Sequence, residues 1–271
     1  MHSVERFCIE LRHSVWLGEA HWLWDRVRLP YNRTIGLCAV RGLRRVINGT
    51  DHIRVLAHCR DVKEQYEPEV WNLLMNEIRP GDSVADVGAY IGLYSVALAM
   101  RVGDKGFVTA LEPDGDNFMA LRSHCKLNRV LERVRLIRAV AGDADGIVGF
   151  ESGKASESRV NPTATAATST VESVRLDAIF EGQKLDVLKI DVEGFEEAVI
   201  RGASQLLADL QRRPRVIFIE VHPYAWPRAG TSDSTLLGLL RTLGYEVFDL
   251  GGRRVTEVCT YGEIVARPLD P

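Results

Sequence analysis

Buried strands that alternate with helices constrain this chain more than any other feature of its sequence. The runs "SVADV", "DVLKI" and "VIFIEV", at residues 83–87, 186–190 and 216–221, are almost continuously apolar. Stretches with helical apolar spacing lie between them, for example "GLYSVALAMRV" and "FEEAVIRGASQLLADL". Strands that are apolar on both faces and alternate with helices are typical of a mostly parallel sheet with helices on both faces. The sequence therefore predicts an α/β fold.

The other segments extend this pattern. "GFVTALEP" and "VRLIRAVAG" are predicted strands, and "PEVWNLLMNEI" and "GDNFMALRSHCKLN" are predicted helices. A Ser/Thr/Ala-rich stretch around residues 153–170 is expected to be a long loop between two strand-like pieces. "SDSTLLGLLRTLG" is a predicted helix with Ser232 or Asp233 as its cap. "YEVFDL", "GGRRVTEV" and "GEIVARP" are predicted closing strands; no helix separates the last two, which implies an antiparallel hairpin at the sheet edge.

Residues 1–60 differ from the rest and are interpreted as a mainly helical N-terminal extension, whereas residues 61–271 form the main domain. The segment "VWLGEAHWLWDRV" contains Trp16, Trp22 and Trp24 at positions that suit an amphipathic helix. These aromatic side chains either pack on the main domain or form a lid or wall for a second substrate, and the sequence leaves both interpretations open. "DHIRVLAH", at the end of the extension, alternates as a strand does.

Composition restricts the class of partner. The chain has 271 residues and is 46% hydrophobic and 26% charged, so it can bury a large core. Its net charge of −3 argues against nucleic acid as the main partner, because phosphate binding requires a dense basic surface. The arginines near residues 41–45 and 212–215 are either solvated surface charge or local basic patches.

The five cysteines are scattered and form no CxxC pair, which argues against a disulfide framework and against a cysteine-rich zinc site. A reduced, cytoplasmic setting is therefore expected. No signal peptide and no membrane span are predicted, although a membrane-borne substrate such as a glycolipid stays compatible with the sequence. A homodimer is the expected association, because symmetric pairs are the commonest oligomers.

The turn "DVGAYIGLYS" follows the first strand of the main domain and contains Gly88 and Gly92. Open α/β sheets bind ligands at the carboxyl ends of their strands, where glycines let a ligand approach the backbone. A nicotinamide dinucleotide favours a GxGxxG turn, whereas this turn has the pattern GxxxG with Asp86 in front. A carboxylate at the mouth of the turn suits a cationic ligand, so Asp86 favours S-adenosylmethionine, which carries a sulfonium and an amino group.

Acids at the ends of the next strands extend this prediction. Glu112 ends the second strand, where a carboxylate can accept hydrogen bonds from ribose hydroxyls or, alternatively, stabilise a helix N-terminus. Asp143 follows the third strand and is a candidate acceptor for an adenine amino group, with Gly142 leaving room for the base. A turn-forming role for Asp143 is the equally open alternative.

Four stretches, taken in order, resemble the FkbM-type S-adenosylmethionine-dependent methyltransferases: "DVGAYIGLYS", "ALEPDGDNF", "LDVLKIDVEGFEEAVIRGA" and "IFIEVHP". The "KIDVEGFE" stretch is the most specific of them, and the resemblance extends from about Tyr66 to the C-terminus. It implies a class I methyltransferase (Rossmann-like) fold with a seven-stranded, mostly parallel sheet of strand order 3-2-1-4-5-7-6. It also implies O-methylation of a hydroxyl on a sugar, polyketide or other small molecule.

The same resemblance completes the predicted cofactor site with Ala89 and Tyr90 in the glycine turn and with Asp191. The family commonly has Asn where this chain has Tyr90. The backbone role of the turn does not depend on that side chain, whereas a side-chain contact to the methionine end of the cofactor does.

The methyl acceptor needs orientation in line with the sulfonium and a group that takes up its proton. Asp191 is the favoured orienting group or base, and His222 is the side chain that titrates nearest neutral pH. Lys189 alternates with Asp191 along the strand, so it either keeps Asp191 ionised or stabilises charge on the acceptor oxygen. Structural roles are the alternatives for both His222 and Lys189. Glu193 and Glu196 are interpreted as acids at a helix start.

Other interpretations stay open at this point. Asp191, Glu220 and His222 are candidate ligands of a divalent metal ion, but the spacing alone does not require a metal. An N- or C-methyltransferase on the same fold, a nicotinamide oxidoreductase, and a cofactor-binding protein without catalytic activity are the alternative functions. The acceptor itself cannot be identified from the sequence.

Overall fold

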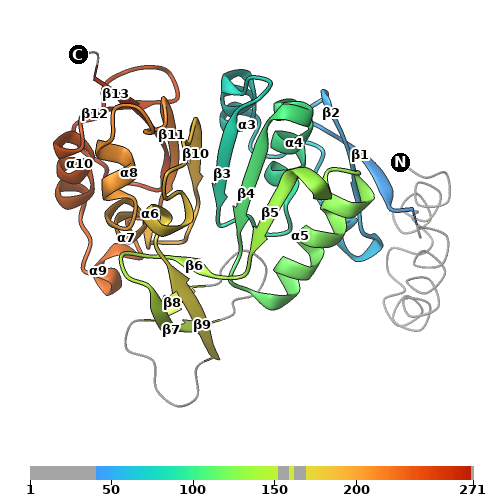
Figure 1. Ribbon diagram of the computed structural model, residues 1–271, viewed down its shortest axis with the longest axis horizontal. Coiled ribbons are helices and arrows are strands. Elements are labelled where there is room, and N and C mark those ends of the chain that lie inside the picture. Colours follow the sequence, from blue (N-terminus) through green and yellow to red (C-terminus); the bar gives the residue numbers. More distant parts are fainter. Residues whose placement is uncertain (1–40, 152–158, 162–168, 270–271) are drawn as a thin grey trace, which may run out of the picture.

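The computed structural model describes residues 41–151, 159–161 and 169–269 (Figure 1). Its largest sheet consists of β3 (Ser83–Val87), β4 (Phe107–Leu111), β5 (Val134–Ile137), β10 (Val187–Ile190), β11 (Val216–Val221), β12 (Tyr245–Asp249) and β13 (Gly262–Pro268). The strand order is β12-β13-β11-β10-β3-β4-β5, and β13 pairs antiparallel with both β11 and β12. The predicted order and the antiparallel last strand are confirmed.

Helices cover both faces of this sheet. One face packs against α3 (Pro68–Glu77), α4 (Leu93–Val102) and α5 (Gly115–Leu127). The other packs against α6 (Leu176–Ile179), α7 (Glu196–Arg201), α8 (Ser204–Ala208), α9 (Trp226–Ala229) and α10 (Asp233–Thr242). Neighbouring strand residues belong to opposite cores: Val84 and Val187 pack on the first face, and Ala85 and Leu188 on the second. The apolar runs of the sequence thus reflect strands buried on both sides.

The α10 helix begins where its sequence predicts. Ser232 is the N-cap, and its hydroxyl accepts a hydrogen bond from the backbone N–H of Thr235. The Thr235 hydroxyl in turn accepts from the backbone N–H of Ser232, which closes a capping box. This reciprocal pair satisfies two of the free donors at the helix start.

The described part of the predicted extension is a hairpin of β1 (Leu43–Ile47) and β2 (Asp51–Val55). Its alternate apolar residues are buried in the same core as α3 and α4. Asp51 also accepts a hydrogen bond from the Trp71 indole at 2.9 Å and pairs with Arg101 at 2.6 Å. The hairpin therefore shares the core of the main domain, while the predicted helices with the three tryptophans lie outside the described residues.

A second sheet contains β6 (Val140–Ala141), β7 (Gly146–Glu151), β8 (Arg159–Asn161) and β9 (Ser169–Val174), in the order β6-β9-β7-β8. The prediction of one strand over "VRLIRAVAG" is therefore wrong, because the chain leaves the large sheet after Ile137 and β6 pairs with β9 instead. Most of the predicted loop at 153–170 lies outside the described residues.

Two further sequence predictions are corrected. The single helix expected over "FEEAVIRGASQLLADL" is split into α7 and α8 at Gly202. A β-carbon at Gly202 would lie 1.8 Å from the carbonyl oxygen of Gly142, so the two backbones pack directly there. The strand expected over "GGRRVTEV" is reduced to one bridge between Phe248 and Arg254.

Gly88 brings the ends of β3 and β10 into contact. Its φ is +83°, and a β-carbon there would lie 1.7 Å from the carbonyl oxygen of Asp191. The backbone N–H of Asp191 donates to the carbonyl of Val87 at 2.9 Å, which fixes the same junction. Glycine is therefore required at residue 88 by the approach of a neighbouring strand, a role that the sequence analysis assigned to a ligand.

We expect Gly88→Ala to lower the free energy of unfolding by about 3 kcal/mol or more, because it combines a left-handed backbone with a clash against a backbone oxygen. Gly81→Ala is the matched control: its φ is +92°, but its β-carbon would meet nothing within 4 Å. The control should lose only about 1 kcal/mol. Urea unfolding curves measure both, and equal losses would show that the contact with Asp191 contributes little.

Candidate active site

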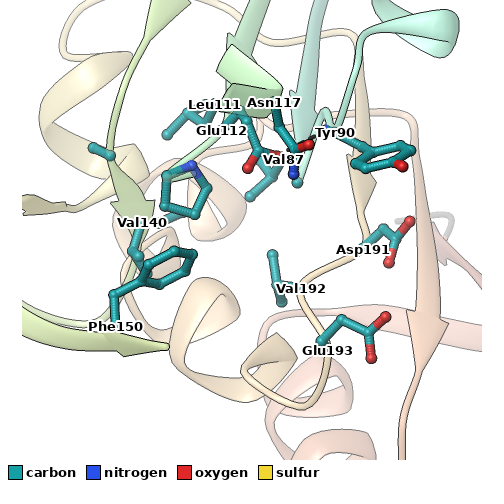
Figure 2. A pocket seen from close by; sticks show the side chains of 14 residues that line it. Val87, Tyr90, Leu111, Glu112, Asn117, Val140, Phe150, Asp191, Val192 and Glu193 are labelled. Carbon is teal, nitrogen blue, oxygen red and sulfur yellow. Dashed lines mark hydrogen bonds between the residues drawn. The ribbon is translucent and has the colours of Figure 1, made fainter. Parts of the chain in front are cut away.

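A pocket lies at the carboxyl ends of β3, β4 and β10, the edge of the sheet where such folds bind ligands (Figure 2). Residues that follow these strands line it together with residues from α5 and the second sheet. They are Val87, Gly88, Tyr90, Leu111, Glu112, Pro113, Asn117, Ala139, Val140, Ala141, Phe150, Asp191, Val192 and Glu193. The structure therefore has a cavity at the edge of the sheet where the sequence predicts the site.

Glu112 is the main polar group on the β4 side of the pocket. Its two carboxylate oxygens accept hydrogen bonds from the backbone N–H groups of Tyr90 and Asp114, at 2.8 and 2.9 Å. The side chain is only 5% exposed, and burial raises the pKa of Glu112 to about 7 even though these hydrogen bonds lower it. The Asn117 side chain is a third hydrogen-bond partner. Because a carboxylate has about four acceptor sites, Glu112 can still accept from a ligand.

Tyr90 serves the site through its backbone. It has a φ of +50°, and its N–H joins the turn after β3 to Glu112 at the end of β4. Its ring lies at the pocket on the side of Asp191 in Figure 2. The replacement of the common Asn by Tyr90 therefore leaves the backbone link to Glu112 in place.

The opposite wall of the pocket is apolar and aromatic. Leu111 comes from β4, Val140 from β6, and Phe150 from β7 of the second sheet (Figure 2). The sequence analysis missed Val140, Phe150 and Asn117. Phe150 reaches the pocket only because β7 pairs with β9, and nothing local in the sequence indicates that pairing.

Asp86 does not face the pocket. It is completely buried, accepts a hydrogen bond from the Ser95 hydroxyl at 2.5 Å, and lies opposite Lys189 in the neighbouring strand. Burial raises the pKa of Asp86, and the positive charge of Lys189 opposes that shift. The cation that Asp86 faces is therefore Lys189, which corrects the expectation that this acid faces the cationic part of the cofactor.

Four more predicted cofactor residues lie away from the pocket wall. Asp143 is exposed and does not line the cavity. Gly142 packs against Gly202 rather than leaving room for a base. Ala89 is buried, and its N–H donates to the carbonyl of Leu111 at 2.9 Å. Gly92, with a φ of +86°, precedes α4, where its hydrogen atom leaves room for Leu121 of α5.

A group of buried ionisable side chains adjoins the pocket at the ends of β10 and β11. Lys189 is 4% exposed, lies 3.3 Å from Asp191, and holds its ammonium group 4.6 Å from the centre of the Tyr94 ring. Burial lowers the pKa of Lys189, but the charges of Asp191 and Asp86 outweigh it and leave the pKa raised. The predicted pairing of Lys189 with Asp191 is confirmed by this distance.

Glu196 fixes the imidazole ring of His222 at its Nδ1 atom. This atom lies 2.7 Å from Oε1 of Glu196. The same oxygen accepts from the N–H of Gly194, and Oε2 of Glu196 accepts from the Trp226 indole. Burial lowers the pKa of His222, but the hydrogen bond and charge of Glu196 outweigh it, so the pKa is raised. Glu196 is therefore a buried partner of His222 rather than only an acid at a helix start.

Glu220 completes the group at the end of β11. Tyr261, which precedes β13, donates a hydrogen bond to its carboxylate. Burial and the neighbouring charge of Asp191 raise the pKa of Glu220 to about 8. Asp191, Glu220 and His222 each offer one ligand atom, and these atoms lie within 4.8 Å of one another. The three metal-ligand candidates are thus brought together by the fold.

Asp191 belongs to both parts of the site. It lines the pocket together with Gly88 and Glu112, and it also contacts Lys189 in the buried ionisable group. The sheet order, with β13 antiparallel between β11 and β12, is that of the class I methyltransferase fold, and the pocket lies at the carboxyl ends of its strands.

The comparisons with known proteins agree. The methyltransferase FkbM domain matches residues 86–247, more than half of the chain, so the protein belongs to this family of S-adenosylmethionine-dependent methyltransferases. It is 26% identical over 165 residues to the hexuronic acid methyltransferase AglP of Haloferax volcanii, a match that covers 60% of this chain and 65% of that relative, just under two thirds of its length.

The chain is also 26% identical over 208 residues to the 31-O-demethyl-FK506 methyltransferase FkbM of Streptomyces tacrolimicus, which covers 70% of this chain and 72% of the relative. Among solved structures, an S-adenosylmethionine-dependent O-methyltransferase of Thermotoga maritima matches with a TM-score of 0.46 and 16% identity, over 79% of this chain and 69% of that one. Within the described residues, no helix is both long and apolar enough to cross a membrane.

The pocket residues fit an adenosyl group. The Glu112 carboxylate is suited to accept from the two ribose hydroxyls, and the wall of Leu111, Val140 and Phe150 is suited to cover an adenine ring. Gly88 and Asp191 line the same pocket beside this wall. The predicted nucleoside role of Glu112 is thus compatible with its position.

We expect binding of S-adenosylhomocysteine to weaken as the pH falls through the pKa of Glu112, about 7. The ionised carboxylate, present above that pKa, is the better acceptor for ribose hydroxyls, so the affinity should drop by up to about tenfold between pH 8 and pH 6. Calorimetry measures this slope. Glu112→Gln should bind more weakly at pH 8 and lose the slope, whereas an unchanged slope in this variant would assign it to another group.

Proposed function

We propose that this protein transfers the methyl group of S-adenosylmethionine to a hydroxyl oxygen of a sugar, a glycolipid or a polyketide-type natural product. The proposal rests on the position of Asp191, because its carboxylate lines the cofactor pocket and also borders the ionisable group at the ends of β10 and β11. A group that touches both partners of a transfer can set their relative position, which supplies much of the rate enhancement.

In this proposal the bound cofactor supplies an activated methyl group, and the chain supplies orientation and proton uptake. Glu112 and the apolar wall hold the adenosyl part. Asp191 accepts a hydrogen bond from the acceptor hydroxyl, directs a lone pair of its oxygen toward the methyl group, and takes up the proton as the new bond forms. Lys189 lies 3.3 Å from Asp191 and holds this carboxylate in place beside the pocket.

His222 acts beside Asp191 as a second polar contact for the acceptor. Its ring is 2% exposed and is fixed on one side by Glu196, so it can change its partner only on the Nε2 side. The hydrogen bond and charge of Glu196 raise the pKa of His222 and hold its Nδ1 side, so the Nε2 side can contact the acceptor. We therefore assign proton uptake to Asp191 and a polar contact with the acceptor to His222.

The relatives support an oxygen acceptor. The name of one relative gives hexuronic acid as its substrate, and the name of the other gives 31-O-demethyl-FK506, a position with an oxygen acceptor. Carboxylates near the acceptor side, including Asp191, Glu193 and Glu220, are good acceptors for the many hydroxyl donors of a sugar. The 13C-methyl form of the cofactor distinguishes the alternatives, because the shift of the transferred carbon differs between O-, N- and C-methyl products.

The decisive variant is Asp191→Asn. We expect its turnover to fall by about 10²- to 10⁴-fold, because the amide cannot take up a proton, while S-adenosylhomocysteine affinity changes little. Release of S-adenosylhomocysteine in the presence of sugar and polyketide alcohols measures the first quantity, and calorimetry the second.

Asp143→Asn is the matched control, because this exposed acid lies outside the pocket and should affect neither measurement. Full turnover in Asp191→Asn would exclude the proposed proton acceptor. Binding of S-adenosylhomocysteine without turnover of any hydroxyl, amine or carbon acceptor by the unmodified protein would instead support the alternative of an inactive cofactor-binding protein.

A further inference from the structure

The group of partly buried ionisable side chains next to the pocket contains more negative than positive charge. Its carboxylates lie around the ends of β10 and β11 and the start of α3: Glu67, Asp191, Glu193, Glu220 and Glu263. Lys189 is the cation that faces them, His222 lies among them, and in the described part of the chain no arginine forms an ion pair with any of these carboxylates. Partly buried charges of one sign favour a compensating cation.

Three of these side chains converge on one point. Asp191, Glu220 and His222 present ligand atoms within 4.8 Å of one another, from the ends of two adjacent strands. Lys189 contacts Oδ2 of Asp191, and within the described residues Oδ1 receives no hydrogen bond. Two carboxylates and one imidazole form a compact set of donors on a rigid part of the sheet.

His222 provides an independent indication that points to a ligand. Its side chain is 2% exposed, and Nδ1 lies 2.7 Å from the Glu196 carboxylate. Nε2 is directed toward the acids, but the nearest oxygens, on Glu193 and Glu220, lie at 3.6 and 3.9 Å, beyond hydrogen-bond distance. A carboxylate at one ring nitrogen, with the other nitrogen making no hydrogen bond to any described residue, is the arrangement that orients histidine ligands in metal sites.

We propose that a divalent cation binds among Asp191, Glu220 and His222, with Glu196 as the residue that positions the imidazole. An imidazole among two carboxylates suits Mn²⁺, Fe²⁺ or Zn²⁺ better than Ca²⁺, which prefers oxygen ligands alone. Three protein ligands leave positions for water or for an acceptor oxygen, and an ion there would increase the acidity of that oxygen. Only this last role rests on the proposed methyl transfer; binding of the ion does not.

The test is titration of the metal-free full-length protein with Mn²⁺, with free Mn²⁺ followed by electron paramagnetic resonance. We expect saturation at one ion per chain, and pulsed spectra of the bound ion should show nitrogen modulation from an imidazole. His222→Gln should remove the nitrogen modulation, and Glu196→Gln should weaken the affinity by about 10- to 100-fold. Glu263→Gln is the matched control, because it removes a nearby carboxylate that is not among the three ligands, and it should leave affinity and spectrum unchanged.

The spectrum of the unmodified protein tests the metal site even if a variant at a buried residue fails to fold. Absence of saturable binding, or a bound ion without nitrogen modulation, overturns the site. An equal loss of affinity in Glu263→Gln and Glu196→Gln also overturns it, because that result indicates diffuse attraction to negative charge. Mn²⁺ binding without methyl transfer would leave the metal site standing and refute the proposed function, whereas methyl transfer without Mn²⁺ binding would do the reverse.

Discussion

The contact between Gly88 and the carbonyl of Asp191 joins the two halves of the sheet, and the candidate site depends on it. The β3 strand and its turn contribute one side of the pocket, and the end of β10 contributes the other. Because no side chain separates the two backbones, the pocket and Asp191 lie within one rigid junction. Reactions that transfer a group between two ligands depend on such fixed distances more than on the strength of either binding interaction.

The fold could be predicted from the sequence because apolar runs and helical spacing indicate directly which residues are buried. Val84, Ala85, Val187 and Leu188 are apolar because each strand is covered on both faces. The predicted nucleoside acid Glu112 and the pair Lys189–Asp191 also followed from position, since strand ends meet at one edge and alternate residues share a side.

The remaining site residues could not be predicted, because they depend on contacts between distant segments. Asp86 has a neighbour on the next strand, Lys189, that neutralises it, and this pairing exists only in the folded sheet. Phe150 reaches the pocket through a second sheet whose register no local pattern indicates. Gly142 and Asp143 were assigned by analogy with a strand that in fact ends earlier, at Ile137.

The site is divided between the two sides of that junction. Glu112 follows β4 and the apolar wall comes from β4 and the second sheet, whereas Glu220 comes from β11, and His222 and Tyr261 from the segments after β11 and before β13 (Figure 1). Tyr261 is 56% exposed at the end of the connection between β12 and β13 and contributes nothing to the core. Natural variation in that connection can therefore alter which acceptor is recognised while the residues of the cofactor pocket stay constant. The same fold can then modify new acceptors and keep its binding site for the methyl donor.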